Sequence, residues 1–341
     1  MDNKIKLFQT ERCWQQIRDQ VWHLVEEEHR HGKAQNGKLV QDLEQRLAQK
    51  FERKHCISVA NCTDALFISL VALDLPPNSR VAVSDYTYLA TAHAIARAGH
   101  IVVPVDVGDD YCVHAWPDDI DAAIAVDIFG NMCTLPNSHI PVIVDAAQSF
   151  ESHDGNQWSA KKGLISCVSF SPSKTVSSWG SGGAVLTDDD DLYLRVKRLR
   201  LYGRDSHGHT SHPGINSMLS SFEAACIWAG LDHQDEWHNR RENITRHLLQ
   251  CSKFITALDT ELPQHTLHKL VFNDTRRTQI MRDLASQNIE SSVHYSTVIH
   301  QQPWYTGKCA KSFDLSTKSF TVPNQHTLTD SEVEHIAKVL S

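Results

Sequence analysis

Short apolar runs alternate with helical patterns over the first half of the chain. Leu39, Leu43, Leu47 and Phe51 recur every four residues and predict a helix over residues 38–54 with one apolar face. The apolar runs, which are rich in β-branched residues, lie at 57–60, 81–83, 101–103, 123–126, 142–144 and 164–170. Such runs, separated by helices, are typical of a mostly parallel sheet that helices cover on both faces. The pattern therefore predicts an α/β fold.

The pattern changes in the C-terminal third. Residues 222–249 have the pattern of one long helix that leads into a second domain. The remaining chain is more polar, with strand candidates at 267–272 and 291–295 and a closing helix after Thr329. This change predicts two domains, and we place the boundary at the start of the long charged stretch. The expected domains are a large one over 1–235, with an N-terminal helical arm, and a smaller α+β one over 236–341.

Composition and charge favour a protein that acts on small molecules. The chain has 341 residues and 41% hydrophobic content, enough to bury a large core. A formal charge of −8 and a pI near 6.2 argue against nucleic-acid binding, which needs clustered Lys and Arg. No apolar run approaches the ~20 residues of a membrane span, and none follows the charged N-terminus. We expect a cytoplasmic protein with neither nucleic acid nor membrane as a partner.

Metal-ligating residue types occur without a metal-like spacing. The nine cysteines include no Cys-x-x-Cys pair and are expected to be reduced, buried thiols. The acidic run 188–191 fits the start of a helix, whose dipole favours carboxylates there. His207, His209 and His212 could form a metal clip, but their Gly- and Ser-rich surroundings favour a loop near the mouth of the site. We expect no metal.

Polar residues directly follow several predicted strands, where open parallel sheets bind their ligands. Residues 61–64 precede a helix and offer backbone N–H groups and a hydroxyl that could hold a phosphate. A plain N-cap by Asn61 or Thr63 is the alternative. Residues 85–88 present aromatic faces that could stack on a flat heterocycle or simply pack in the core. The candidate site therefore lies at this edge of the sheet.

Two charged residues stand at the ends of later strands. Asp145 follows the apolar Pro-Val-Ile-Val segment, where desolvation penalises an unpaired carboxylate. Its cationic partner could equally be a protonated pyridine nitrogen or a structural arginine. Lys174 follows a buried strand among small hydroxyl residues, and desolvation there would make its amine nucleophilic, as a Schiff-base lysine requires. An ordinary surface lysine in a loop is the other interpretation.

The order of these signals along nearly the whole chain resembles that of the sugar aminotransferases of the DegT/DnrJ/EryC1/StrS family, which share the fold type I of aspartate aminotransferase. The matching motifs are residues 61–66 with Ser-Gly-Thr-x-Ala-Leu, 86–91 with Tyr-Thr-Phe-x-Ala-Thr, 144–148 with Glu-Asp-Ala-Ala-Gln, 169–174 with Ser-Phe-His-x-x-Lys, 214–225 with Gly-x-Asn-x-Arg…Ala-Ala, and 294–300 with His-Tyr-x-Pro-Leu-His. The resemblance implies a pyridoxal 5′-phosphate (PLP) enzyme with a large, mostly parallel sheet and a smaller C-terminal domain.

The resemblance also implies roles for individual residues around the cofactor. Lys174 would form the internal aldimine and then shuttle a proton, while Asp145 would keep the pyridine nitrogen protonated. Gln148 would hydrogen-bond the ring hydroxyl and Tyr88 would stack on the ring. The residues expected at the phosphate are Thr63, Asp64 and Ser169, and Asn216 would reach in from the second subunit of a homodimer.

The reaction implied by the family is transfer of an amino group from L-glutamate to a 3-keto or 4-keto group of a nucleotide-linked (dTDP, UDP or GDP) deoxysugar, by a ping-pong mechanism. His294, Tyr295 and His300 would contact this substrate. An aminocyclitol aminotransferase, a PLP-dependent sugar dehydratase and a non-catalytic regulatory protein are the alternatives. The dehydratases of the family carry histidine in place of the Schiff-base lysine, so Lys174 argues against that class.

The sequence departs from the family pattern at several positions. Cys62 replaces a glycine, Asn61 a serine, Ser181 the acidic residue of Gly-Glu-Gly-Gly, and Met218 an arginine, and 297–298 is Thr-Val in place of Pro-Leu. We expect these changes to leave the PLP chemistry intact and to alter the substrate pocket and parts of the dimer contact.

Overall fold

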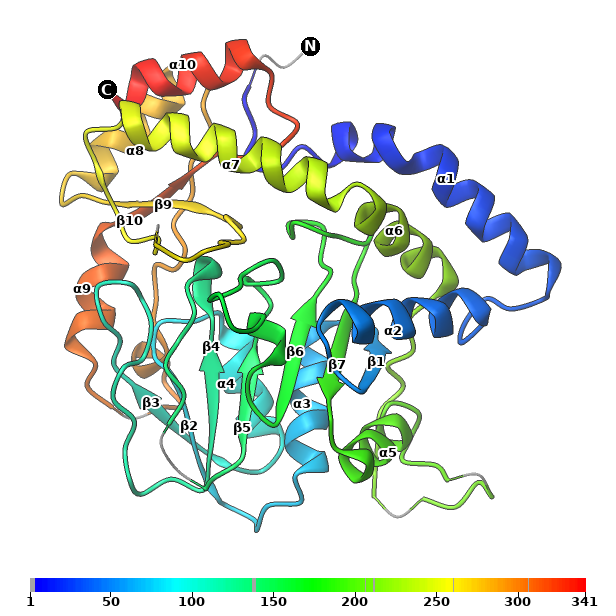
Figure 1. Ribbon diagram of the computed structural model, residues 1–341. Helices are drawn as coiled ribbons and strands as arrows, with labels where there is room; N and C mark the ends of the chain where they lie inside the picture. The colour runs from blue at the N-terminus through cyan, green and yellow to red at the C-terminus, as the bar shows by residue number, and fades with distance from the viewer. Residues whose placement is uncertain (1–3, 137–138, 206, 211, 260, 306) are drawn as a thin grey trace.

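The centre of the protein is a seven-stranded sheet. The computed structural model describes the chain except for residues 1–3, 137–138, 206, 211, 260 and 306. The strand order is β1-β7-β6-β5-β4-β2-β3 (Figure 1). The strands are β1 (His55–Val59), β2 (Arg80–Ser84), β3 (Ile101–Val105), β4 (Ala122–Val126), β5 (Val142–Asp145), β6 (Ile165–Ser169) and β7 (Gly183–Thr187). All except β7 lie at the apolar runs noted above, so the mostly parallel α/β sheet is confirmed.

Strand β7 differs from the other strands in two ways: it was not predicted from the sequence, and it runs antiparallel to its neighbours. It pairs antiparallel with β1 and with β6, whereas the pairs from β6 to β3 are parallel. Its first residue, Gly183, lies against the turn that follows β1. A Cβ on Gly183 would stand 2.7 Å from backbone atoms of Asn61 and Cys62, closer than real Cβ contacts allow. Glycine is therefore needed here for β7 to pack beside this turn.

Helices cover both faces of the sheet because successive strand residues point to opposite sides. On β5, Ile143 packs with the side of the sheet that α3 and α5 cover, and Val144 with the side that α1, α2 and α6 cover. The helices of this large domain are α1 (Thr10–Arg30), α2 (Lys38–Lys50), α3 (Cys62–Ala72), α4 (Leu89–Arg97), α5 (Asp190–Leu199) and α6 (Ser221–Asp232). This is a core with two layers of helices around one sheet.

Helix ends differ from the predicted ones where the backbone leaves the helical region. The helix expected over 38–54 ends at Lys50, and Glu52 has a left-handed φ of 54° that stops it. The single helix expected over 222–249 is two helices, α6 and α7 (Gln234–Cys251), divided at His233, which caps both. The acidic run was interpreted correctly, because Asp189 caps α5 through the N–H groups of Asp191 and Leu192.

The C-terminal part forms a second, antiparallel sheet in the order β10-β9-β8, with β8 (Ile255–Thr256), β9 (Leu270–Asn273) and β10 (Ser319–Val322). Strand β9 confirms the candidate at 267–272. The candidate at 291–295 is wrong, because only Ser292 makes an isolated bridge, to Thr321. Helices α8 (Arg277–Ser286), α9 (Ala310–Lys318) and α10 (Asp330–Leu340) flank the sheet, and α10 confirms the closing helix after Thr329.

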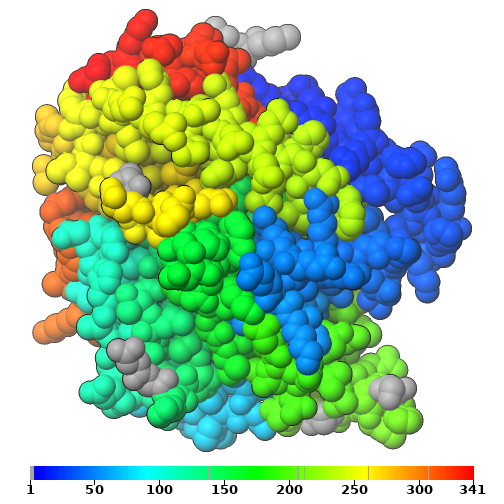
Figure 2. All heavy atoms as spheres, viewed as in Figure 1, coloured from blue at the N-terminus to red at the C-terminus, as the bar shows by residue number. Residues whose placement is uncertain are grey.

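The small sheet sits above the carboxyl ends of the parallel strands, to which the arrows of β4, β5 and β6 point (Figure 1). Figure 2 shows the yellow segment near residues 250–270 lying across the top of the green part of the large domain. A buried ion pair joins the two parts: Arg241 on α7 donates from Nη1 to Glu151 Oε2 over 3.0 Å. Among the helices of the described chain, none has the length and apolar character needed to cross a membrane.

Candidate active site

A cavity of about 400 Å³ lies between the carboxyl ends of the large sheet and the small sheet. It brings together eight of the eleven predicted site residues, from five separate segments of the chain, which makes it the candidate active site. These eight are Thr63, Tyr88, Asp145, Gln148, Ser169, Lys174, His294 and Tyr295. The other three, Asp64, Asn216 and His300, do not line it.

Lys174 lies in the loop between β6 and β7. The loop closes on itself, since Phe170 N–H donates to the Gly182 carbonyl and Ser178 N–H to the Phe170 carbonyl. Lys174 N–H in turn donates to the Ser171 carbonyl, so its backbone is fixed in a tight turn. Burial lowers the pKa of the amine to about 8, against the opposing influence of Cys62 and Asp145. The lowered pKa increases the fraction of neutral, nucleophilic amine at neutral pH above that of an ordinary lysine.

Asp145 is the last residue of β5 and is 6% exposed. Its carboxylate accepts hydrogen bonds from Thr91 Oγ1 at 2.9 Å and from Ala147 N–H at 3.1 Å. Burial raises its pKa, and these two bonds and the charge of Lys174 oppose that rise. Within the described chain no arginine or lysine nitrogen lies within 4.0 Å of this carboxylate, so the structural-arginine alternative does not hold. The position can take a cationic N–H from a ligand.

The turn after β1 combines both interpretations proposed for it. Asn61 caps α3, accepting from Asp64 N–H over 2.8 Å, as the plain alternative expects. The cap leaves the N–H groups of Cys62 and Thr63 without an intrahelical partner at the positive end of α3, facing the cavity. Burial raises the pKa of the Cys62 thiol well above its usual value, so the sulfur is a neutral wall of the cavity. An anionic group can bind beside it.

A hydrogen-bonded chain crosses the cavity from the large to the small domain. Gln148 Nε2 donates to Tyr295 Oη at 3.1 Å, and its Oε1 accepts from Phe129 N–H. His268 Nδ1 lies 3.2 Å from the same Oε1. On the far side of Tyr295, the Tyr88 ring is 5.7 Å away, centroid to centroid. These contacts fix the walls that would enclose a flat ligand.

His268 and Lys269 line the cavity from the segment before β9, and Phe8 lines it from the N-terminal segment. None of the three was among the residues predicted at the site. Lys269 is 7% exposed, and its Nζ lies 4.5 Å from the centre of the Phe8 ring. Burial and the charge of Lys174 lower its pKa to about 7. The available signal was the polar pair His268-Lys269 inside the strand candidate 267–272, whose other four residues are apolar.

Two of the three residues outside the cavity lie nearby. The Asp64 carboxylate points away, accepting from Ser217 Oγ at 2.8 Å and from Asn61 Nδ2 at 3.1 Å. It therefore supports the cap of α3 instead of lining the cavity. Asn216 is exposed and bridges to Leu201, which leaves its side chain available to another chain.

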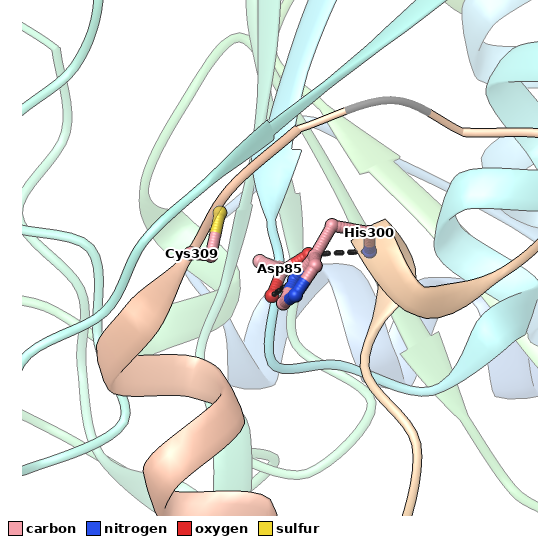
Figure 3. Close-up of side chains that lie close together, drawn as sticks. All are labelled: Asp85, His300 and Cys309. Carbon is pink, nitrogen blue, oxygen red and sulfur yellow. Dashed lines mark hydrogen bonds and ion pairs between the residues drawn. The ribbon is translucent and has the colours of Figure 1, made fainter.

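His300 is held by a carboxylate outside the cavity. Its Nδ1 and its backbone N–H both bond to Asp85 at 2.7 Å, and Cys309 stands beside the pair (Figure 3). Ile299 N–H also donates to the Asp85 carbonyl. Asp85 follows β2, so the cluster ties the loop after Tyr295 to the large sheet. In the parts of the chain that are described, this is the one group of three whose geometry could suit a metal ion, and the His207–His209–His212 loop forms none.

Comparisons with known proteins agree with this geometry. Residues 15–341 match the family model described as the DegT/DnrJ/EryC1/StrS aminotransferase family. A UDP-2-acetamido-2-deoxy-3-oxo-D-glucuronate aminotransferase of Pseudomonas aeruginosa is 28% identical over 95% of this chain and 96% of its own length. A dTDP-3-amino-3,6-dideoxy-alpha-D-galactopyranose transaminase of Aneurinibacillus thermoaerophilus is 28% identical over 89% of this chain and 90% of its own.

The fold has close counterparts among solved structures. The crystal structure of a DegT DnrJ EryC1 StrS aminotransferase from Brucella abortus superposes with a TM-score of 0.90 at 23% identity and covers 98% of each chain. The fold type expected from the sequence is therefore confirmed, with helices on both faces of the large sheet and a smaller domain above it.

Proposed function

The chain belongs to the DegT/DnrJ/EryC1/StrS aminotransferase family, and on that premise we propose that it uses PLP to move an amino group onto a keto group of a nucleotide-linked sugar. One observation carries the proposal. Lys174, with its amine pKa lowered to about 8, and the unpaired carboxylate of Asp145 face the same enclosed cavity at the carboxyl ends of the strands. A nucleophilic amine beside a buried acceptor is the pair of groups that this chemistry needs.

The residues present fit PLP. Asp145 is buried without an ion-pair partner in the described chain, as a carboxylate that receives a pyridinium N–H would be. The first turn of α3 and the hydroxyls of Thr63 and Ser169 offer donors for a phosphate. The Tyr88 ring forms an aromatic wall. When bound, PLP supplies a reactive carbonyl and a ring that withdraws electrons from the substrate carbon.

This chain's own residues would bind, orient and move the proton. Lys174 Nζ, with a pKa near 8, can accept a proton from the substrate carbon and return it to a neighbouring atom. Thr91 and the Ala147 N–H hold the Asp145 carboxylate in one orientation. Asp64 would act indirectly, by fixing the Asn61 cap that aims the first turn of α3 into the cavity.

The finer assignments follow from the resemblance and the relatives. We propose L-glutamate as the amino donor and two half-reactions in a ping-pong sequence, because one enclosed cavity must serve both substrates. The names of the two relatives above both refer to the third sugar carbon, which favours a 3-keto acceptor. His294 and Tyr295 line the cavity where this substrate would lie. The exposed Asn216 supports a homodimer in which it completes the partner's site.

Chemical trapping tests the proposal directly. Protein loaded with PLP and reduced with borohydride should carry a pyridoxyl group on Lys174, located by peptide mass spectrometry. Lys174→Arg should carry none, whereas Lys162→Arg, which replaces a lysine bonded to the Cys133 carbonyl away from the cavity, should still be labelled. In a separate assay with unreduced, PLP-loaded protein, glutamate with a labelled nitrogen should transfer the label to the sugar. Absence of a pyridoxyl group from Lys174 in the wild-type protein would refute the proposal.

A further inference from the structure

Lys269 is a buried cation for which the described chain provides no anion. Its side chain is 7% exposed, and no carboxylate oxygen of the described residues lies within 4.0 Å of its Nζ. Among the described residues, the recorded neighbour of the ammonium is the face of the Phe8 ring, whose centre lies 4.5 Å from Nζ. A ring face attracts the positive charge but accepts none of the three N–H groups in a normal hydrogen bond. These donors therefore remain available to a ligand in the cavity.

The Phe8 ring is held in place rather than lying there by chance. Leu7 N–H donates to Glu290 Oε2 at 2.8 Å, and Ile5 pairs with Ile289 through backbone hydrogen bonds. The N-terminal segment is thus attached to residues 288–290 of the small domain just before Phe8. These contacts hold the Phe8 ring against the ammonium at the cavity wall.

The other basic groups on this wall are neutral. Burial and the neighbouring lysines lower the pKa of His294 to about 3, and burial lowers that of His268 well below its usual value. The charge of Asp145 acts on Lys174 and raises the pKa of its amine, whereas no carboxylate of the described residues lies within 4.0 Å of Lys269 Nζ. The lining therefore carries two lysines against one carboxylate, and an anion entering the cavity meets Lys269 on the side of the small domain.

We propose that Lys269 binds a carboxylate group of the substrate and so selects acidic substrates. The inference rests on the proposed function, because it assumes that amino donor and acceptor enter this cavity. The carboxylate can come from the amino donor or from an acidic sugar. In both cases the ammonium gains an acceptor for its unused N–H groups and an opposite charge in a desolvated site, where such a bond is strong.

Equilibrium binding to protein loaded with pyridoxamine phosphate, measured by isothermal titration calorimetry, tests the inference without turnover, because this amine form reacts with neither the amino acids nor the non-keto sugars below. The donor arm compares L-glutamate with L-glutamine and L-isoglutamine, each lacking one carboxylate. The sugar arm compares a uridine diphosphate-linked N-acetylhexosamine with the corresponding uronate. The variants are Lys269→Met, the charge-preserving Lys269→Arg, and Lys253→Met, a control in which an exposed lysine near the Phe254 ring is replaced.

In one arm, Lys269→Met should lower the affinity for the ligand that carries the carboxylate by about 10- to 100-fold, the range expected when a hydrogen bond to a charged group is lost. The analogue without that carboxylate should change by less than about twofold, Lys269→Arg should recover part of the loss, and Lys253→Met should match the wild type. The arm that responds identifies the source of the carboxylate. Equal weakening of every ligand, or no weakening, would overturn the inference. Failure of the proposed function shows separately, as absence of the pyridoxyl group on Lys174.

Discussion

The buried ammonium of Lys269 should destabilise the cofactor-free protein in a pH-dependent way. Burial and Lys174 lower its pKa in the folded protein to about 7, whereas the unfolded chain should titrate near 10.4. Between these values the unfolded state binds more protons, so the free energy of unfolding rises with pH. Below about pH 7 the folded protein bears the full cost of the buried charge, and above about pH 10 the cost is gone.

The size of the effect follows from the same two values. Each pKa unit corresponds to about 1.4 kcal/mol, so lowering the pKa from 10.5 to about 7 corresponds to a cost of about 5 kcal/mol for burying the charge, an upper limit for this enclosed group. Contact with the Phe8 ring offsets about 1 kcal/mol of that cost. Replacing the lysine by an apolar side chain of similar length should remove the remainder. Lys269→Met should therefore raise the free energy of unfolding by about 3–4 kcal/mol near pH 7 and by less than about 1 kcal/mol near pH 10.

Urea denaturation of the cofactor-free protein, followed by circular dichroism from about pH 6 to about pH 10, measures this difference. The matched control is Lys253→Met, which replaces an exposed lysine over the Phe254 ring and should give the wild-type curve at every pH. A gain in stability for Lys269→Met that does not shrink as the pH rises would refute the reasoning, as would a loss of stability near pH 7.

Three further outcomes are expected. Asp145→Asn should lower the rate of amino transfer by about 10²- to 10³-fold, because the preorganised charge of the carboxylate is lost, while the cofactor still binds covalently to Lys174. An unchanged rate would contradict the role of the carboxylate. The rate at which cofactor-free protein captures PLP should rise about tenfold per pH unit up to about pH 8 and then level off, because the neutral amine of Lys174 is the attacking form. Stopped-flow absorbance measures this rate, and a rate that does not change with pH would contradict the role of the amine. Arg241→Met should lower the free energy of unfolding by about 3–5 kcal/mol, because the buried Glu151 loses its arginine and keeps only the contacts of its carboxylate with His238 and Thr266. Arg240→Met, at an exposed pair, should cost less than about 1 kcal/mol, and equal losses in urea denaturation would contradict this expectation.

The sheet and the reactive half of the cavity could be predicted because their signals are local. A short β-branched run predicts a strand, and the residue that directly follows the run lies at the carboxyl edge of the sheet. This rule alone brings Asp145 and Lys174 into one cavity, although 29 residues separate their numbers. The antiparallel β7 was missed because a strand's direction depends on its neighbours. The sequence around Gly183 also does not reveal that this residue packs against the turn at Asn61 and Cys62.

Helix-terminal geometry explains why some polar residues were misplaced. Asp64 has the residue type and position of a ligand at a helix N-terminus. The Asn61 cap turns its carboxylate toward Ser217, a residue 153 positions away. His300 likewise belongs to a motif expected at the substrate, yet Asp85, 215 positions earlier, binds it from the end of β2. In both cases a distant partner decides the direction of the side chain, and single-sequence reasoning has no access to that partner.

In this fold, the residues proposed for the amino-transfer chemistry and those proposed for substrate selection lie on different domains. Residues at or just after strand ends supply the amine of Lys174, the carboxylate of Asp145 and the turn at which we propose that an anion binds, and these positions depend only on β1, β5 and β6. The small domain adds Lys269 and His268 from the opposite side, together with Phe8 from the other end of the chain. Their positions depend on how the second sheet packs on the first, so a change at the domain contact can alter the choice of substrate while leaving Lys174 and its surroundings intact. Substrate selection should therefore vary more readily among proteins of this fold than the amino-transfer step itself.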